Sequence, residues 1–243
     1  HTVQVTVAFG EPDDVTADPL RIGPIPMPKL PEQKSAFTRS CPPSEVAWQI
    51  GPQQFAQLDE ARTTTLRLNV LIDAEQHSQT HHIELLARDE WHAQLVPESL
   101  AAFVTPNSSA LMPVLHRASE LLEEKTGSSA LSGYQEGPER VRQIAESVYD
   151  ALGEKRLTYI NPPASFEDTG QKIRRIEDML EHRMGTCLDL SVLYAAALEQ
   201  AGIHPVVVLV PGHAFAGYLA HDEQLAQPVL EDRGMIDNVV RTA

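Results

Sequence analysis

The sequence of 243 residues has few cysteines, few positive charges and no long apolar run. Its two cysteines, Cys41 and Cys187, argue against a disulfide framework and favour a reducing compartment. The longest apolar run, around Val206–Val210, is too short to cross a bilayer. Lys and Arg number 19 against 34 Asp and Glu, and the resulting net charge of −15 is spread along the chain. We therefore expect a cytoplasmic protein with neither a membrane segment nor a nucleic-acid partner.

The first residues of the sequence bear on whether it is part of a longer protein. No secretory signal precedes the first strand-like segment, and the sequence begins with His1 rather than Met. We expect a piece of a longer protein. Hydrophobic residues make up 42% of it, an ordinary share for a chain that buries a core, and its length suits one large domain or two smaller ones.

The first part of the chain alternates apolar and polar residues, which predicts half-buried antiparallel strands. A proline-rich stretch, residues 24–31, interrupts this pattern and predicts an extended loop or linker, because proline lacks a backbone donor. We predict a mostly β, sandwich-like domain over residues 1–104. The alternating residues are Val3, Val5 and Val7, then Leu66, Leu68, Val70 and Ile72, then Ile83, Leu85 and Ala87, with a further short strand at Val46–Ile50.

Four histidines in this part raise the question of a metal site. His81 and His82 are neighbours on one predicted strand, so their rings point to opposite faces. His77 and His92 add no zinc-ligand spacing, and no cysteine lies near. We expect solvent-facing histidines and no metal.

From residue 106 the apolar period changes to that of helices. The first predicted helix ends at Gly127, and the second begins at Gly137-Pro138. A third, carrying Ile173, Ile176 and Met179, ends before Gly185, and a fourth with one apolar stripe runs from Cys187 to Gly202. We predict an α+β domain over residues 105–243, with helices packed on an antiparallel sheet.

Cys187 and His213 form the candidate reactive pair. The start of a helix offers free N–H groups and a positive dipole, which favour a thiolate at Cys187. Two strand-like segments flank Pro211-Gly212 and predict a hairpin, with His213 at its turn. If the helix packs across the hairpin, the two side chains approach each other as a nucleophile and a base. The alternative is a small buried cysteine and a merely hydrogen-bonded histidine.

Four motifs lie around this pair: Gly185-Thr186-Cys187-Leu188-Asp189-Leu190, Tyr194–Leu198, Ala201-Gly202-Ile203 and Gly212-His213-Ala214-Phe215. Together they resemble the transglutaminase-like superfamily, which has a papain-like cysteine protease fold. The resemblance covers roughly residues 105–220. It implies that Cys187 is the nucleophile and His213 the general base. Residues 165–166 and 170–174 further resemble a transglutaminase-like domain of large bacterial multidomain proteins that carry helicase-type ATPase regions.

The family also has an acidic residue that orients the histidine. Asp232 is the candidate here, although it suits a helix N-cap equally, Asp222 sits in a predicted turn, and the true residue could follow Ala243. The backbone N–H of Cys187 and the side chain of Gln171 are the candidate oxyanion donors.

Three further residues are not expected to take part in the chemistry. Asp189 is expected to stabilise the helix start or to pair with Arg174 or Arg183. Trp48 and Trp91 both fall in the β part, so neither is an obvious oxyanion tryptophan for this site.

The sequence thus predicts a peptidase or amidase that acts on a protein or peptide substrate through a thioester and needs no cofactor. Hydrolysis is favoured over crosslinking on the strength of the bacterial resemblance. The alternative is a catalytically inactive protein-binding module that regulates an ATPase or helicase region of the same parent protein.

Overall fold

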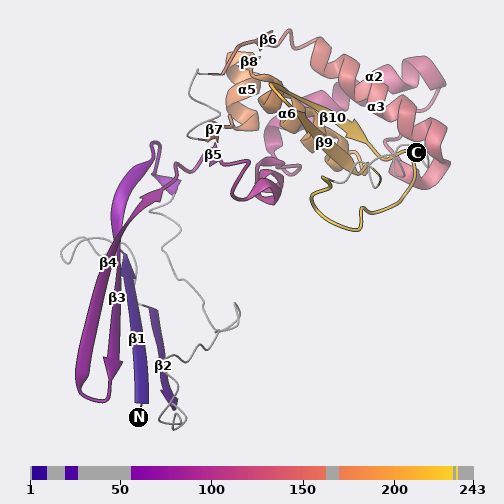
Figure 1. Ribbon diagram of the computed structural model, residues 1–243. Helices are drawn as coiled ribbons and strands as arrows, with labels where there is room; N and C mark the ends of the chain where they lie inside the picture. Colours follow the sequence, from indigo (N-terminus) through magenta and orange to yellow (C-terminus); the bar gives the residue numbers. More distant parts are fainter. Residues whose placement is uncertain (1, 10–19, 27–55, 163–169, 232–233, 235–243) are drawn as a thin grey trace. The chain divides into compact units, whose positions relative to one another are not determined.

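The computed structural model describes residues 2–9, 20–26, 56–162, 170–231 and 234. These residues form an α+β protein whose chain divides into two compact units, His1–Arg88 and Asp89–Ala243. No helix among them is long and apolar enough to cross a membrane. The first unit is built of strands, and the second combines helices with short strands (Figure 1).

The first unit contains one antiparallel sheet with the strand order β2-β1-β3-β4. Its strands are β1 (Thr2–Phe9), β2 (Leu20–Pro26), β3 (Arg62–Ile72) and β4 (Glu75–Leu85). β3 and β4 form a long hairpin, in register from Arg62 opposite Leu85 to Ile72 opposite Glu75. The predicted strands are therefore present. The described residues show this one sheet and not the two packed sheets of a sandwich, and the strand predicted at Val46–Ile50 lies outside them.

The proline-rich stretch was predicted wrongly in part. Pro24 and Pro26 belong to strand β2, which pairs with β1 and lies at the edge of the sheet. The register between the two strands shifts between Val3 and Val5, where Pro24 falls. An edge strand with a bulge accommodates proline because few of its backbone N–H groups are needed for pairing.

The second unit surrounds one central helix, α6 (Cys187–Gln200). The other helices are α2 (Met112–Thr126), α3 (Pro138–Gly153) and α5 (Ile176–His182), with short 3-10 turns η2 (Pro97–Phe103), η3 (Ser109–Leu111) and η4 (Gly133–Glu136). The hairpin of β9 (Pro205–Val210) and β10 (His213–Tyr218) packs on α6 (Figure 1). Two further ladders have two residues per strand: β5 (Glu90–Trp91) with β7 (Gln171–Lys172), and β6 (Thr158–Tyr159) with β8 (Met184–Gly185).

Local chemistry explains the predicted helix ends. Gly127 closes α2 in the left-handed conformation, with φ of 77°, a conformation that costs glycine little. Pro138 starts α3, where its missing N–H is not needed.

The third helix is shorter than predicted. It begins at Ile176, and Ile173 precedes it in extended chain while remaining buried.

Helix α6 is buried around most of its circumference, and the prediction of a single apolar stripe was too narrow. Leu193 and Leu198 pack in a core with α2 and α3, whereas Leu188 and Val192 pack in a second core. Between them, Ala195, Ala196 and Ala197 are fully buried. A helix that is apolar all round belongs inside a domain, so Cys187 begins the central element of this unit.

The boundary between the units lies earlier than predicted. Residues 89–104 were assigned to the β domain, but Trp91 and Leu100 are buried in the second core with Ile173 and Ala214. The backbone N–H of Ile173 donates to the Asp89 carbonyl at 2.7 Å. These contacts place the segment in the second unit.

Tyr134 forms hydrogen bonds with the backbone at the open end of the β9–β10 hairpin. Its hydroxyl donates to the Leu219 carbonyl and accepts from the His204 backbone N–H, each at 2.9 Å. Burial raises the pKa of Tyr134 above its ordinary value, so the hydroxyl keeps its proton. The residues just before β9 and just after β10 are thus held by one partly buried side chain.

Candidate active site

The start of α6 is closed by a reciprocal cap immediately before Cys187. Thr186 is the N-cap, and its hydroxyl accepts from the Asp189 backbone N–H at 3.2 Å. In return, the Asp189 carboxylate accepts from the Thr186 backbone N–H at 2.9 Å. This capping box satisfies two donors that a helix start leaves free.

Asp189 has a second partner, and the structure decides for Arg174 over Arg183. The carboxylate is fully buried and accepts from the backbone N–H and from Nη1 of Arg174, at 2.9 and 2.8 Å. A buried carboxylate with three donors is well satisfied. Asp189 therefore holds the first turn of α6 against the segment that follows β7, as expected for a structural role.

The hairpin brings His213 to the same region as Cys187. His213 is opposite Val210 across the Pro211-Gly212 turn, as the sequence predicts. Its neighbour Ala214 is buried at 5% exposure, whereas the His213 side chain is exposed. Cys187 is a partly buried free thiol.

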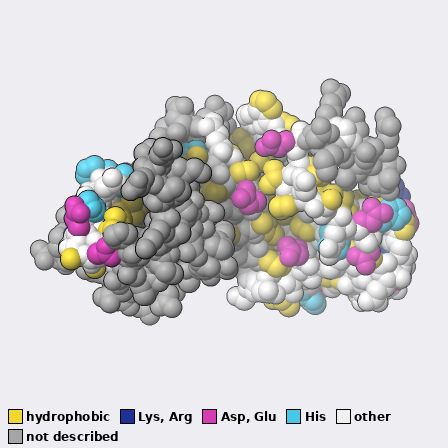
Figure 2. Space-filling view, turned by 60° about the horizontal axis from the view of Figure 1, so that its bottom comes forward, with side chains coloured by type: hydrophobic (Ala, Val, Ile, Leu, Met, Phe, Trp, Pro, Cys, Tyr) yellow, Lys and Arg dark blue, Asp and Glu magenta, His cyan; other side chains and the backbone are white. Residues whose placement is uncertain are grey.

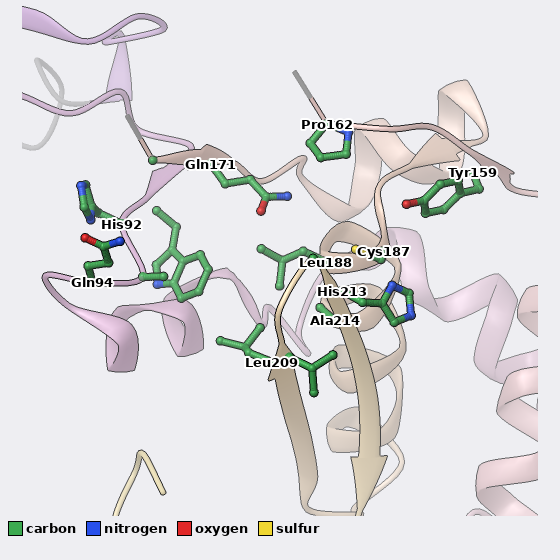
Figure 3. A pocket seen from close by; sticks show the side chains of 15 residues that line it. His92, Gln94, Tyr159, Pro162, Gln171, Cys187, Leu188, Leu209, His213 and Ala214 are labelled. Atoms are coloured by element: carbon green, nitrogen blue, oxygen red, sulfur yellow. The ribbon is translucent and has the colours of Figure 1, made fainter. Parts of the chain in front are cut away.

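One cavity of about 290 Å³ is lined by both Cys187 and His213 (Figure 3). Its other polar lining residues are His92, Gln94, Tyr159 and Gln171. Its apolar lining residues include Trp91, Pro162, Leu188, Leu209, Val210 and Ala214. The predicted nucleophile and base thus share a cavity with the predicted oxyanion residue.

The two short ladders build opposite walls of this cavity. β5 pairs Trp91 with Gln171, and the parallel pair β6–β8 sets Tyr159 beside Gly185. Figure 3 shows the Tyr159 hydroxyl directed into the cavity on the side of His213. Segments far apart in sequence therefore meet around Cys187 through pairings of only two residues.

Gln171 lies close to the start of α6. Its Nε2 donates to the Thr186 hydroxyl at 3.4 Å, a long hydrogen bond. Thr186 directly precedes Cys187, so the amide is near the Cys187 backbone N–H. This is the neighbourhood in which two donors could share one oxyanion.

The predicted acidic partner of His213 is not among the described residues. Asp232 lies outside them, and Asp222 accepts from Nε2 of His204 at 3.1 Å. No Asp or Glu lines the cavity in the described part of the chain. Within the same residues, no hydrogen bond joins the Cys187 thiol to the His213 ring.

The assignment of Trp91 to the β part was wrong. Trp91 is 4% exposed, belongs to the second unit and lines the cavity. Residues 89–104 show no helical or long alternating pattern, so periodicity assigned them to the preceding strands. The only local signal is that Trp91 is large and apolar in a segment with few other core residues, which predicts burial without predicting its partner.

The four histidines behave differently from one another. His77, His81 and His82 are exposed on β4, as expected, but His92 is half-buried, and its Nδ1 is buried without a hydrogen-bond partner. Among the described residues, no group of three or more His, Cys, Asp or Glu side chains is arranged to hold a metal ion.

Acidic side chains are dispersed over the surface. Figure 2 shows Asp and Glu scattered among hydrophobic side chains on one face, with little Lys or Arg in view. The cavity differs from this surface because its described lining contains no Asp, Glu, Lys or Arg.

Comparison of the chain with known protein families, curated proteins and solved structures found no match.

Proposed function

We propose that the second unit is a cysteine-dependent acyl-transfer domain of the transglutaminase-like type, a peptidase or amidase in which Cys187 is the nucleophile and His213 the base. The observation that carries the proposal is the shared cavity. Cys187 begins a central helix, His213 begins the second strand of a hairpin packed on that helix, and both side chains line one space of about 290 Å³. Nucleophile and base within reach of one reacting group are what acyl transfer requires.

In the first step, the Cys187 sulfur attacks the carbonyl carbon of an amide or peptide bond while His213 takes the thiol proton. The carbonyl oxygen becomes an oxyanion, which the Cys187 backbone N–H and the Gln171 amide would stabilise. When the C–N bond breaks, His213 returns the proton to the leaving amine. The acyl group remains on Cys187 as a thioester.

In the second step, water attacks the thioester carbon and His213 accepts its proton. When the C–S bond breaks, a carboxylic acid is released and His213 returns the proton to the sulfur, which restores the Cys187 thiol. The substrate is a protein or peptide, and the reaction takes place in the cytoplasm, the compartment that the sparse cysteines favour.

A second candidate is favoured by one observation. Within the described residues, the cavity lacks a carboxylate and Cys187 lacks a hydrogen bond to His213. A site without an orienting acid suits a protein-binding module that regulates an ATPase or helicase region of the same parent protein. Under this reading, Cys187 is a small partly buried residue at a helix start.

The rate of alkylation of Cys187 by iodoacetamide, measured from pH 4 to pH 10 by mass spectrometry of its peptide, separates the two candidates. An activated thiol reacts at pH 6 faster than N-acetylcysteine amide does, because a larger fraction is thiolate. His213→Ala should reduce this advantage. The binding module predicts a rate at or below that of the model thiol and no effect of His213→Ala.

Turnover is tested by acyl-enzyme trapping with activated esters of capped amino acids. A mass increase on the Cys187 peptide that is absent in Cys187→Ser supports the thioester. The exposed His77 provides the matched control, because His77→Ala removes a histidine from the other unit and should leave both readouts unchanged.

A further inference from the structure

The cavity beside Cys187 has an apolar floor that is continuous with a buried core. Trp91, Leu188 and Ala214 line the cavity, and they are 4%, 2% and 5% exposed. The same three side chains belong to the second core, against which Cys187 itself is packed. The floor is therefore held by close packing, and an apolar surface begins directly beside the sulfur.

The rim of the cavity is also apolar. Leu209 and Val210 lie at the end of β9 and line the opening while remaining 45% and 43% exposed. Large aliphatic side chains left this open at a cavity mouth have apolar surface available for a bound group. The apolar surface of the floor therefore continues to the opening of the cavity.

The polar groups of the described lining are neutral donors and acceptors or histidines. Gln94 and Gln171 are amides, Tyr159 is a phenol, and the lining residues that the structure describes include no carboxylate, amine or guanidinium. A charged group that enters such a space loses hydration and finds, among the described lining residues, no carboxylate, amine or guanidinium to pair with. A neutral apolar group loses nothing and removes apolar area from water.

The cavity volume limits what fits. About 290 Å³ lies at the lower end of the roughly 300–1,000 Å³ usual for pockets that enclose a whole small molecule. This space suits one side chain and its carbonyl, with the rest of a longer substrate outside.

We infer that the cavity selects acyl groups with an uncharged apolar side chain, of the size of leucine or phenylalanine, next to the carbonyl that Cys187 attacks. The inference rests on the proposed function, because it names the substrate class of that site. Trp91, Leu188 and Leu209 are the specificity-determining residues. Gln171 and the Cys187 backbone N–H bind the neutral carbonyl, so charge on the ligand is not needed for orientation.

Protection of Cys187 tests the inference without requiring turnover. The full chain is alkylated with iodoacetamide in the presence of increasing N-acetyl-leucinamide, N-acetyl-phenylalaninamide, N-acetyl-glutamate amide or N-acetyl-lysinamide, and the modified Cys187 peptide is quantified. The leucine and phenylalanine compounds should protect at concentrations about tenfold or more below the charged ones, the effect of good apolar contacts in a hydrophobic pocket. Equal protection by charged compounds, or no protection by any, overturns the inference.

Two variants locate the selectivity. Leu209→Lys places a cation at the rim, so the leucine compound should protect about tenfold less well and the glutamate compound should begin to protect. Phe215→Lys is the matched control, because Phe215 is 47% exposed on the same hairpin but does not line the cavity. A change of selectivity in Phe215→Lys as large as in Leu209→Lys would show that the effect comes from general charge.

The outcomes separate this inference from the proposed function. Selective protection together with an unactivated Cys187 leaves an apolar binding site without catalysis, and refutes the acyl-transfer proposal alone. Thioester formation without selectivity refutes the substrate class and leaves the enzyme.

Discussion

Replacing Asp189 by Asn is expected to destabilise the second unit strongly, although the two side chains have nearly the same shape. Asp189 is fully buried, and its carboxylate accepts three hydrogen bonds, from the Thr186 N–H and from the N–H and Nη1 of Arg174. Asn offers one acceptor oxygen and places an NH₂ group where the other oxygen was. In either orientation, at least one buried donor then faces another donor.

The size of the expected loss of stability follows from the hydrogen bonds and the charge that the substitution removes. A buried N–H left without an acceptor costs about 1–3 kcal/mol. Loss of the charged partner of Arg174 adds to this, within the roughly 3–5 kcal/mol measured when one member of a buried pair is removed. Arg174 is 39% exposed and recovers some hydration, so we expect a total loss of about 2–4 kcal/mol. This is a large part of the stability of a domain, roughly 5–15 kcal/mol.

Urea denaturation followed by fluorescence measures the loss. The chain has two tryptophans, so a Trp48→Phe background leaves the buried Trp91 as a reporter in the second unit. Far-UV circular dichroism checks that α6 still forms. The midpoint should fall without a change in the slope m, because the mutation changes stability and not the surface exposed on unfolding.

Two control variants show how large a change in stability a single cap hydrogen bond and an exposed ion pair produce. Thr186→Ala removes the hydroxyl that accepts from the Asp189 N–H and, through a long hydrogen bond, from Gln171 Nε2, and it leaves the Asp189 carboxylate in place, so it should cost about 1 kcal/mol. Glu139→Gln breaks an ion pair with Arg142 whose side chains are 63% and 68% exposed, and should change the midpoint much less. If Asp189→Asn shifts the midpoint no more than Glu139→Gln does, the account of Asp189 as a buried clamp on α6 is refuted.

Two further predictions concern other parts of the second unit. The Ser108 hydroxyl donates to the Glu177 carboxylate at 2.6 Å, and this hydrogen bond lowers the pKa of Glu177. Because the folded pKa is lowered, the hydrogen bond adds to the free energy of unfolding at pH values above the ordinary carboxyl pKa of about 4.3. This contribution is lost as the pH falls through the folded pKa. Urea titrations of Ser108→Ala should therefore show a loss of about 1 kcal/mol at pH 7 and a smaller loss at pH 3, and an undiminished loss at pH 3 would contradict the reasoning. Gly133 and Gly127 both have positive φ, 56° and 77°, but a Cβ at Gly133 would lie 2.8 Å from the Gly202 carbonyl oxygen, whereas a Cβ at Gly127 meets nothing within 4 Å. Both alanine variants should lose about 1–3 kcal/mol of stability from backbone strain. The melting temperature should fall further for Gly133→Ala alone, because its Cβ approaches the Gly202 carbonyl oxygen. Equal melting temperatures for the two variants would show that this close approach has no cost.

The features that could be predicted from sequence depend on residues close together in the chain. Gly127 and Pro138 mark helix ends because of their own backbone geometry. The Pro211-Gly212 pair between two β-branched or aromatic segments predicts a hairpin with His213 at its turn, and the structure has it. Thr186 and Asp189 have the spacing of a capping box, so the helix starts at Cys187. Each of these signals needs only a few residues of context.

Only the tertiary structure decided which distant segments meet at Cys187. Trp91 joins the cavity wall because it pairs with Gln171, and Tyr159 does so beside Gly185, through ladders of two residues per strand. Such short pairings produce no periodic pattern, so the sequence could not show them. The choice of Arg174 as the partner of Asp189 and the burial of α6 on nearly all sides also depend on packing against segments far away in the chain. Local signals therefore indicated Cys187 and His213 as candidate site residues and predicted the elements that carry them, whereas long-range packing determined the apolar cavity that both residues line.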